Sequence, residues 1–261
     1  MNFVIDGMHV DVHGDGQLPY LLLVHGFLSN RGQWRPNLAA LSQVCTPVTI
    51  ELLGHGRSGA PTDPATYQVD AYVARFEVLR ERLETAAWFI CGQSFGAGLT
   101  LRYALTHPAR VTGQIFTNSV SALSPPMSQG PADQLAALDA GDVAALRAMP
   151  YYPRPSKRLP PVVWQEMVDD AALLQPSAIA NALRATVPGL SVAADIGRTA
   201  VPTLLVNGMR EDAFQPFRTL AATEIPGVEI ADVDGGHSIN LDRADAFDAA
   251  VAAFIVQHMP G

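Results

Sequence analysis

The chain has 261 residues, of which 17 are Lys or Arg and 25 are Asp or Glu, so its formal net charge is −8. This acidic balance provides no basic footprint for nucleic acid, and no apolar run reaches the roughly 18 residues of a membrane span, so neither partner is expected. Because the N-terminus lacks the layout of a signal peptide and two cysteines do not make a disulfide framework, we expect a cytoplasmic protein.

Short apolar runs alternate with helical patterns along most of the chain, and this alternation predicts an α/β fold with helices on both faces of a mostly parallel sheet. The chain order predicts an opening hairpin, and eight strands in total. The expected strands are Phe3–Asp6, His9–His13, Tyr20–Val24, Thr46–Leu52, Ala87–Cys91, Thr112–Asn118, Pro202–Asn207 and Val228–Val233. The expected helices include residues around 72–83, Phe95–Thr106 and a terminal helix around 247–254.

The composition changes in the middle of the chain, where eight of the twenty prolines lie between Pro125 and Pro161. This stretch has no strand pattern, but it carries helical patches at Ala132–Ala140 and Val163–Leu174. We therefore expect a helical lid at residues 121–198, inserted into a core domain of residues 1–120 and 199–261.

The motif Gly92-Gln93-Ser94-Phe95-Gly96 lies where an expected strand ends and a helix begins. A tight turn of this kind needs neighbours with almost no side chain, and it lifts the serine hydroxyl above the sheet at a helix N-terminus, whose dipole favours a developing anion. Ser94 is therefore the candidate nucleophile. An ordinary strand–helix turn is the structural alternative.

Serine needs a base to accept its proton, and His237 is the best candidate among seven histidines. It follows the last expected strand in a glycine-rich loop, which is where parallel sheets place ligand chemistry. By contrast, His25 and His55 are expected to stabilise loops through hydrogen bonds.

The base needs a carboxylate that fixes its tautomer and stabilises the imidazolium. Glu211 and Asp212 both follow the expected strand Pro202–Asn207, and adjacent side chains cannot easily share one direction. Position alone leaves both as candidates for the acid.

Acyl transfer also needs an oxyanion hole, formed by two backbone N–H groups. Phe95 follows the nucleophile and supplies one candidate donor, and Phe27 in the loop after the third strand supplies the other. Trp34 and Trp164 are candidate pocket residues beside these two aromatic rings, with core packing as the alternative.

Five motifs in this order resemble the α/β-hydrolase superfamily over nearly the whole chain. They are His25-Gly26-Phe27, Gly54-His55-Gly56-Arg57-Ser58, Gly92-Gln93-Ser94-Phe95-Gly96, Gly208 with Glu211 or Asp212, and Gly236-His237. The first two, together with Trp34, are similar to the branch that contains the SHCHC synthases of the menaquinone pathway. That branch's acid loop, G-x-x-D-x-x-F, implies Glu211 as the acid.

The chain departs from that branch after the nucleophile, where S-x-G-G-R is replaced by Ser94-Phe95-Gly96-Ala97-Gly98. The missing arginine argues against the same lyase activity. The resemblance implies a serine hydrolase that cleaves an ester-like bond of a small molecule through an acyl-enzyme.

Other activities remain open on the same residues: a lyase, a C–C bond hydrolase or a lactonase in a metabolic pathway, or a small-molecule receptor with the same fold and no catalysis. Neither a metal nor a cofactor is expected, because the sequence has no clustered Cys/His spacing and no dinucleotide loop. The sequence specifies neither the substrate nor the oligomeric state.

Overall fold

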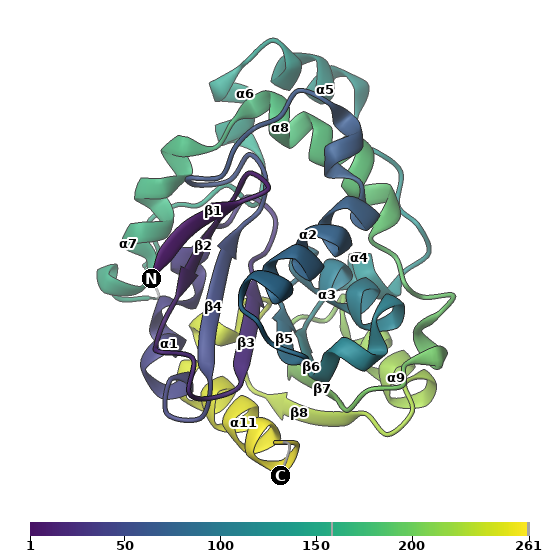
Figure 1. Cartoon of the computed structure of the whole chain (residues 1–261). Coiled ribbons are helices and arrows are strands. Elements are labelled where there is room, and N and C mark those ends of the chain that lie inside the picture. The colour runs from purple at the N-terminus through teal and green to yellow at the C-terminus, as the bar shows by residue number, and fades with distance from the viewer. Residues whose placement is uncertain (158, 260–261) are drawn as a thin grey trace.

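The computed structural model describes residues 1–157 and 159–259. Its single sheet has eight strands in the order β1-β2-β4-β3-β5-β6-β7-β8. The strands are β1 Asn2–Ile5, β2 Met8–Val12, β3 Tyr20–Val24, β4 Thr46–Glu51, β5 Trp88–Gly92, β6 Val111–Thr117, β7 Thr203–Gly208 and β8 Glu229–Val233. β2 pairs antiparallel with β1 and β4, and every other pairing is parallel (Figure 1). The expected eight-stranded, mostly parallel sheet is confirmed.

Helices fill the connections between the strands. They are α1 Arg35–Leu41, α2 Val69–Arg82, α3 Phe95–Thr106, α4 Val120–Leu123, α5 Ala132–Asp139, α6 Val143–Ala148, α7 Pro161–Asp170, α8 Pro176–Asn181, α9 Gln215–Glu224, α10 Ile239–Asp242 and α11 Ala244–Gln257. A π-helical turn at Ala182–Thr186 continues α8. Short 3₁₀ helices lie at Arg31–Trp34, Pro64–Tyr67, Pro108–Arg110, Ala171–Leu173, Val187–Gly189 and Ile196–Arg198. Among the described helices, none is long and apolar enough to cross a membrane.

The central strands are buried on both faces because successive side chains point to opposite sides of the sheet. In β3, Leu22 and Val24 pack into a core cluster with α2 and α3. Leu21 and Leu23 point the other way, into a cluster with α1 and α11. This double burial explains why the Tyr20–Val24 segment has a continuous apolar run.

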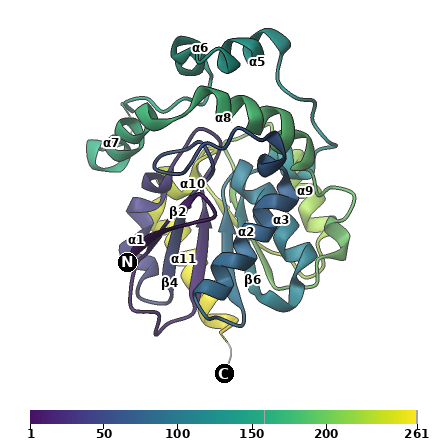
Figure 2. The ribbon, with the colours of Figure 1, turned by 45° about the horizontal axis from the view of Figure 1, so that its top comes forward.

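The segment between β6 and β7 lies above the sheet and carries α5, α6, α7 and α8 (Figure 2). We call residues 121–198, apart from 158, which lies outside the described residues, the cap segment. It has an apolar cluster of its own that includes Leu135, Leu146 and Ile179 and that also takes in Leu28 of the core. Within its described residues the cap segment has helices and no strand.

Ion pairs attach α7 to the core. Arg57 Nη1 lies 2.7 Å from Asp170 Oδ2, and Arg31 Nη2 lies 2.9 Å from Glu166 Oε1. These two ion pairs hold α7 against the core.

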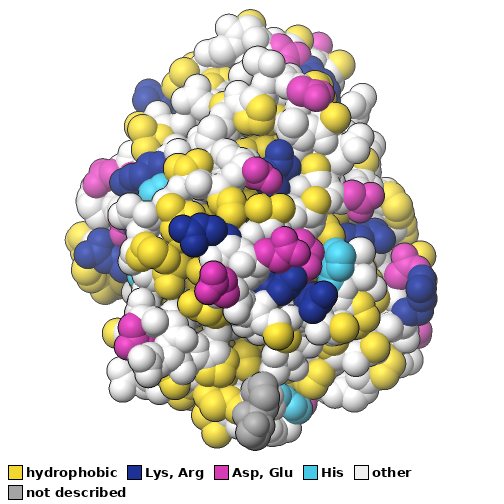
Figure 3. Space-filling model, in the orientation of Figure 1, with side chains coloured by type: hydrophobic (Ala, Val, Ile, Leu, Met, Phe, Trp, Pro, Cys, Tyr) yellow, Lys and Arg dark blue, Asp and Glu magenta, His cyan; other side chains and the backbone are white. Residues whose placement is uncertain are grey.

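The surface carries charges of both signs. On the face seen in Figure 3, basic side chains lie in separate groups among acidic ones.

Buried hydrogen bonds connect α1, α10 and α11. Asn37 Nδ2 donates to Asp248 Oδ1 at 2.8 Å and to the carbonyl oxygen of Asn240 at 3.0 Å. Asp248 is only 7% exposed, and burial raises its pKa to about 6 against the opposing effect of the Asn37 hydrogen bond. The ionised carboxylate is therefore destabilising at neutral pH.

We expect Asp248→Asn to raise the free energy of unfolding at pH 8 by about 1–3 kcal/mol, because it removes a buried charge and keeps an acceptor for Asn37. Between about pH 4 and pH 6, Asp248 of the folded wild type holds a proton that the unfolded chain has released. The contribution of Asp248 to the free energy of unfolding therefore falls as pH rises through this window. Urea titrations at pH 8 and pH 4 test this. A gain of equal size at both pH values would contradict it.

Candidate active site

The turn between β5 and α3 holds Ser94 in a strained backbone conformation. Ser94 has φ +52° and ψ −113°, a left-handed conformation that costs free energy for a residue with a side chain. A Cβ atom at Gly96 would overlap the carbonyl oxygen of Val24, and one at Gly92 would overlap Gly96 itself. Gly96 therefore lets α3 approach β3, and Gly92 lets it approach β5, closely enough to hold Ser94 at the carboxyl end of the sheet.

His237 and Glu211 meet above the carboxyl ends of β7 and β8. His237 Nδ1 lies 2.9 Å from both Oε1 and Oε2 of Glu211. Asn118, which follows β6, donates from Nδ2 to Glu211 Oε2 at 2.9 Å. Although burial raises the pKa of Glu211, its hydrogen bonds to His237 and Asn118 and the charge of His237 hold that pKa below the ordinary value. Glu211 is thus kept ionised beside the imidazole.

Asp212 is not part of this arrangement. Its side chain is exposed, and its carbonyl oxygen accepts the N–H of Gln215 in the turn before α9. The structure therefore contradicts Asp212 as the alternative acid, because adjacent side chains in this turn point in different directions and Glu211 takes the inward one.

Two backbone N–H groups in the described segments beside Ser94 have no protein acceptor. Among the described residues, neither Phe27 N–H nor Phe95 N–H donates to a protein acceptor. Phe95 is the first residue of α3, where helical N–H groups have no partner within the helix. The Phe27 loop passes close to the nucleophile, since a Cβ at Gly26 would lie 3.6 Å from Ser94 Cβ. Both remain the candidate oxyanion donors.

Buried histidines hold the loop that carries Phe27. His25 Nε2 accepts the N–H of Leu52 at 3.0 Å, and His55 Nε2 accepts the N–H of Leu28 at 3.2 Å. Gln33 Oε1 accepts the N–H of Gly26 at 3.1 Å. His25 and His55 thus have the loop-stabilising contacts expected from the sequence.

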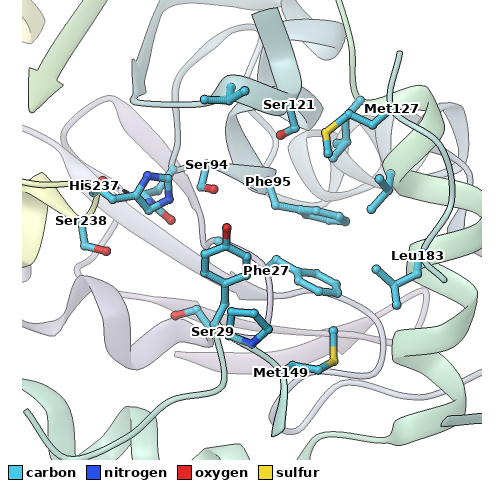
Figure 4. Close-up of a pocket in the computed structure, with 18 of the residues that line it drawn as sticks. Phe27, Ser29, Ser94, Phe95, Ser121, Met127, Met149, Leu183, His237 and Ser238 are labelled. Carbon is cyan, nitrogen blue, oxygen red and sulfur yellow. Dashed lines mark hydrogen bonds between the residues drawn. The ribbon is translucent and has the colours of Figure 1, made fainter. Parts of the chain in front are cut away.

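Ser94 and His237 open into a cavity of about 620 Å³ between the core and the cap segment (Figure 4). The rings of Phe27 and Phe95 stack in its wall with centroids 5.3 Å apart. Figure 4 shows His237 and Ser238 on one side of the view, with Met127 and Leu183 on the other. Its remaining lining is mostly apolar and comes largely from the cap segment, including Pro131, Met149, Pro150, Tyr151, Pro153, Met167 and Val187.

The two expected tryptophans do not line this cavity, so their assignment to the pocket was wrong. Trp34 is fully buried and packs against Phe247 on the far face of the sheet, with ring centroids 6.1 Å apart. Trp164 belongs to α7, and its Nε1 donates to the carbonyl oxygen of Leu159 at 3.0 Å. Core packing was the correct alternative for Trp34.

Sequence reasoning missed Asn118, which binds both Glu211 and the backbone of Gly208. A polar residue at the carboxyl end of an apolar strand was a usable signal, because the neighbouring parallel strand ends at the same edge. It also missed Ser29 and Gln33, which line the cavity. Their only signal was proximity to the Phe27 loop.

The fold and this arrangement of Ser94, His237 and Glu211 define a protein of the α/β-hydrolase type. A family model described as alpha/beta hydrolase fold matches residues 19–244. The chain therefore belongs to the α/β-hydrolase family.

Relatives differ in how much of the chain they match. RutD of Agrobacterium fabrum, provisionally named a carbamate hydrolase, is 26% identical over 264 residues, which cover 95% of this chain and 98% of RutD. The mouse (lyso)-N-acylphosphatidylethanolamine lipase is 38% identical over only 100 residues, or 38% of this chain. The matched part spans 29% of that lipase's length.

Solved structures of low identity share the fold over nearly the whole chain. The enol-lactonase from Burkholderia xenovorans LB400 has a TM-score of 0.79 at 23% identity and covers 98% of this chain and 100% of its own. MenH from S. aureus has a TM-score of 0.75 at 20% identity, with coverage of 97% and 99%. At these identities the likeness concerns the fold alone.

We expect Glu211→Gln to lower kcat by about 100- to 10,000-fold, because the neutral amide neither fixes the working tautomer of His237 nor stabilises its protonated form. Asp212→Asn is the matched control, since it makes the same change in charge at the neighbouring exposed position, and its kcat should stay within about threefold of wild type. Steady-state kinetics on one ester substrate compares them. Equal losses in the two variants would refute the assignment of Glu211.

Proposed function

We propose that the chain hydrolyses an ester of a small, uncharged molecule whose acyl part is apolar. The observation that carries this proposal is the cavity into which Ser94 and His237 open. Among its described lining residues, Glu211 is the only carboxylate and there is no Lys or Arg. An anionic substrate would find no counter-charge there, whereas an apolar acyl chain gains free energy by leaving water.

The first half of the reaction acylates Ser94. Ser94 Oγ attacks the ester carbonyl carbon while His237 Nε2 takes the hydroxyl proton, and the carbonyl π electrons move onto the oxygen. Phe27 N–H and Phe95 N–H stabilise that oxyanion. The intermediate then collapses, the bond to the alcohol oxygen breaks, and His237 gives its proton to the departing alkoxide.

The second half restores the enzyme. Water attacks the acyl carbon, His237 takes one of its protons, and the bond to Ser94 Oγ breaks as the proton returns to the serine. The net change is ester plus water to carboxylic acid plus alcohol. Glu211 stays ionised throughout and stabilises the imidazolium that forms in each half. In this proposal the cap segment acts as a lid that covers the apolar acyl part of the substrate, while a water molecule still reaches the acyl carbon.

The lyase alternative loses its main support at Gly98, where the SHCHC synthase branch has arginine. A Cβ atom at Gly98 would lie 2.8 Å from Leu190 Cδ2 and 2.9 Å from the carbonyl oxygen of Leu190. The local packing leaves no room for a long side chain. Lactones and carbamates remain related candidate substrates, because the same attack on a carbonyl carbon opens them and because a relative of full length carries the name of a carbamate hydrolase.

We expect wild type to hydrolyse p-nitrophenyl esters of two- to ten-carbon acids, with a preference for acyl chains of intermediate length. Ser94→Ala should lower kcat/KM by at least about 10,000-fold, because nothing else in the site forms the acyl-enzyme. Release of p-nitrophenol at 405 nm measures both.

Fluorophosphonate labelling supplies the control. Labelled but inactive wild type would contradict ester hydrolysis and direct attention to lactones, carbamates or carbon–carbon bonds. Tight binding of a small molecule without turnover would instead support a receptor. Activity that survives in Ser94→Ala would refute the nucleophile.

A further inference from the structure

The last helical turns of the cap segment place an apolar stripe along the cavity. Leu183, Val187 and Leu190 all line the cavity. Leu183 belongs to the π-helical turn Ala182–Thr186, Val187 begins the 3₁₀ turn Val187–Gly189, and Leu190 follows it with helical dihedral angles. Residues spaced by four and three positions share one face of a helix. The three side chains therefore follow one another along one wall.

Contacts at the two ends of the stripe give it a direction. A Cβ atom at Gly98, one turn into the helix that follows Ser94, would lie 2.8 Å from Leu190 Cδ2. At the other end, a Cβ atom at Gly130 of the cap segment would lie 3.3 Å from Leu183 Cδ1. Seven residues of helix span about 10 Å. The stripe thus begins beside the helix of the nucleophile at Leu190 and ends within the cap segment at Leu183.

The turn that carries Leu183 is held from both sides. Thr186 Oγ1 donates to the carbonyl oxygen of Tyr67 at 2.5 Å, which connects the turn to the core. Arg184 Nη1 donates to Asp139 Oδ1 at 2.9 Å, which connects it to α5. Leu183 itself is only 8% exposed. Its side chain cannot move aside for a longer ligand without disturbing the close packing around it.

The chemistry of acyl transfer determines which part of an ester meets this stripe. The leaving oxygen takes its proton from His237, so the alcohol part must lie toward His237. Figure 4 shows Leu183 on the opposite side of the view from His237, with the rings of Phe27 and Phe95 between them. The acyl chain therefore extends over these two rings toward Leu183.

We propose that Leu183 closes the acyl end of the cavity and limits the length of the acyl chain. Leu183 shares its apolar cluster with Leu135 and Leu138, which are buried and, among the described residues, are not part of the cavity lining. The substrate class is then an ester of a medium-chain acid whose last carbons reach Leu183. This inference rests on the proposed ester hydrolysis and adds the residue that selects the acyl length.

The p-nitrophenyl esters of hexanoic and decanoic acid test this limit through the ratio of kcat/KM for decanoate to that for hexanoate. Leu183→Ala should raise the ratio about tenfold, because it opens room for about two methylenes and each buried methylene contributes about fourfold. Leu183→Phe should lower the ratio, because its larger side chain shortens the site. Both changes should appear in KM, since carbons far from the carbonyl bind equally in the ground state and the transition state.

Leu146→Ala is the matched control, because Leu146 belongs to the same buried cluster but, among the described residues, is not one of those that line the cavity. It should lower the melting temperature as Leu183→Ala does and leave the ratio as in wild type. If Leu183→Ala does not fold, the opposite shift in Leu183→Phe decides. Unchanged ratios in the Leu183 variants, or an equal rise in Leu146→Ala, would overturn the proposal.

A binding measurement separates this inference from the proposed reaction. 2-Heptanone and 2-undecanone carry the same alkyl chains as the two esters, but they are not hydrolysed. Calorimetry should show little gain in affinity from the shorter to the longer ketone in wild type, and about a tenfold gain in Leu183→Ala. If wild type hydrolyses neither ester, the proposed reaction fails, and the ketones still decide the length limit. A gain of about fourfold for every added methylene in wild type would refute it.

Discussion

The close approach of α3 to β3 and β5 is the constraint on which the rest of the site depends. Gly96 permits the approach to β3, since a Cβ atom there would overlap the carbonyl oxygen of Val24, and Gly92 permits the approach to β5, since a Cβ atom there would overlap the backbone of α3. The tight turn holds Ser94 in a left-handed conformation directly before the first residue of α3. The packing of the surrounding core offsets the free-energy cost of that conformation, because the turn lies between a fully buried strand and a mostly buried helix.

Much of the fold and the main candidate residues could be predicted because they depend on local patterns. Continuous apolar runs mark buried strands, and the glycines of the Ser94 turn and of the His237 loop lie at strand ends. Side-chain direction and long-range contacts could not be read in this way. Glu211 and Asp212 differ only in where one turn points them, and Trp34 is apolar enough for either a pocket or a core.

The cavity has two unlike walls because it is built from two unlike parts of the chain. The core supplies loops at strand ends, where backbone donors, His237 and hydroxyl groups gather. The cap segment supplies short helices that bury leucine and methionine in their own cluster. Met167 lines the cavity and belongs to α7, the helix that is ion-paired to the core. Asn30 Nδ2 also donates to the carbonyl oxygen of Met167 at 3.0 Å. Cap position and pocket shape are therefore coupled.

The histidines that hold the Phe27 loop give the molecule an intrinsic sensitivity to acid. Burial and the neighbouring His55 lower the pKa of His25 to about 3, and burial lowers that of His55 to about 4. Each ring accepts a backbone hydrogen bond through Nε2 and so must stay neutral in the fold. The unfolded chain would protonate both near pH 6.5, so stability falls as the pH drops below that value. Acidification would thus loosen the loop of the candidate oxyanion donor by charging two residues that take no part in the proposed chemistry.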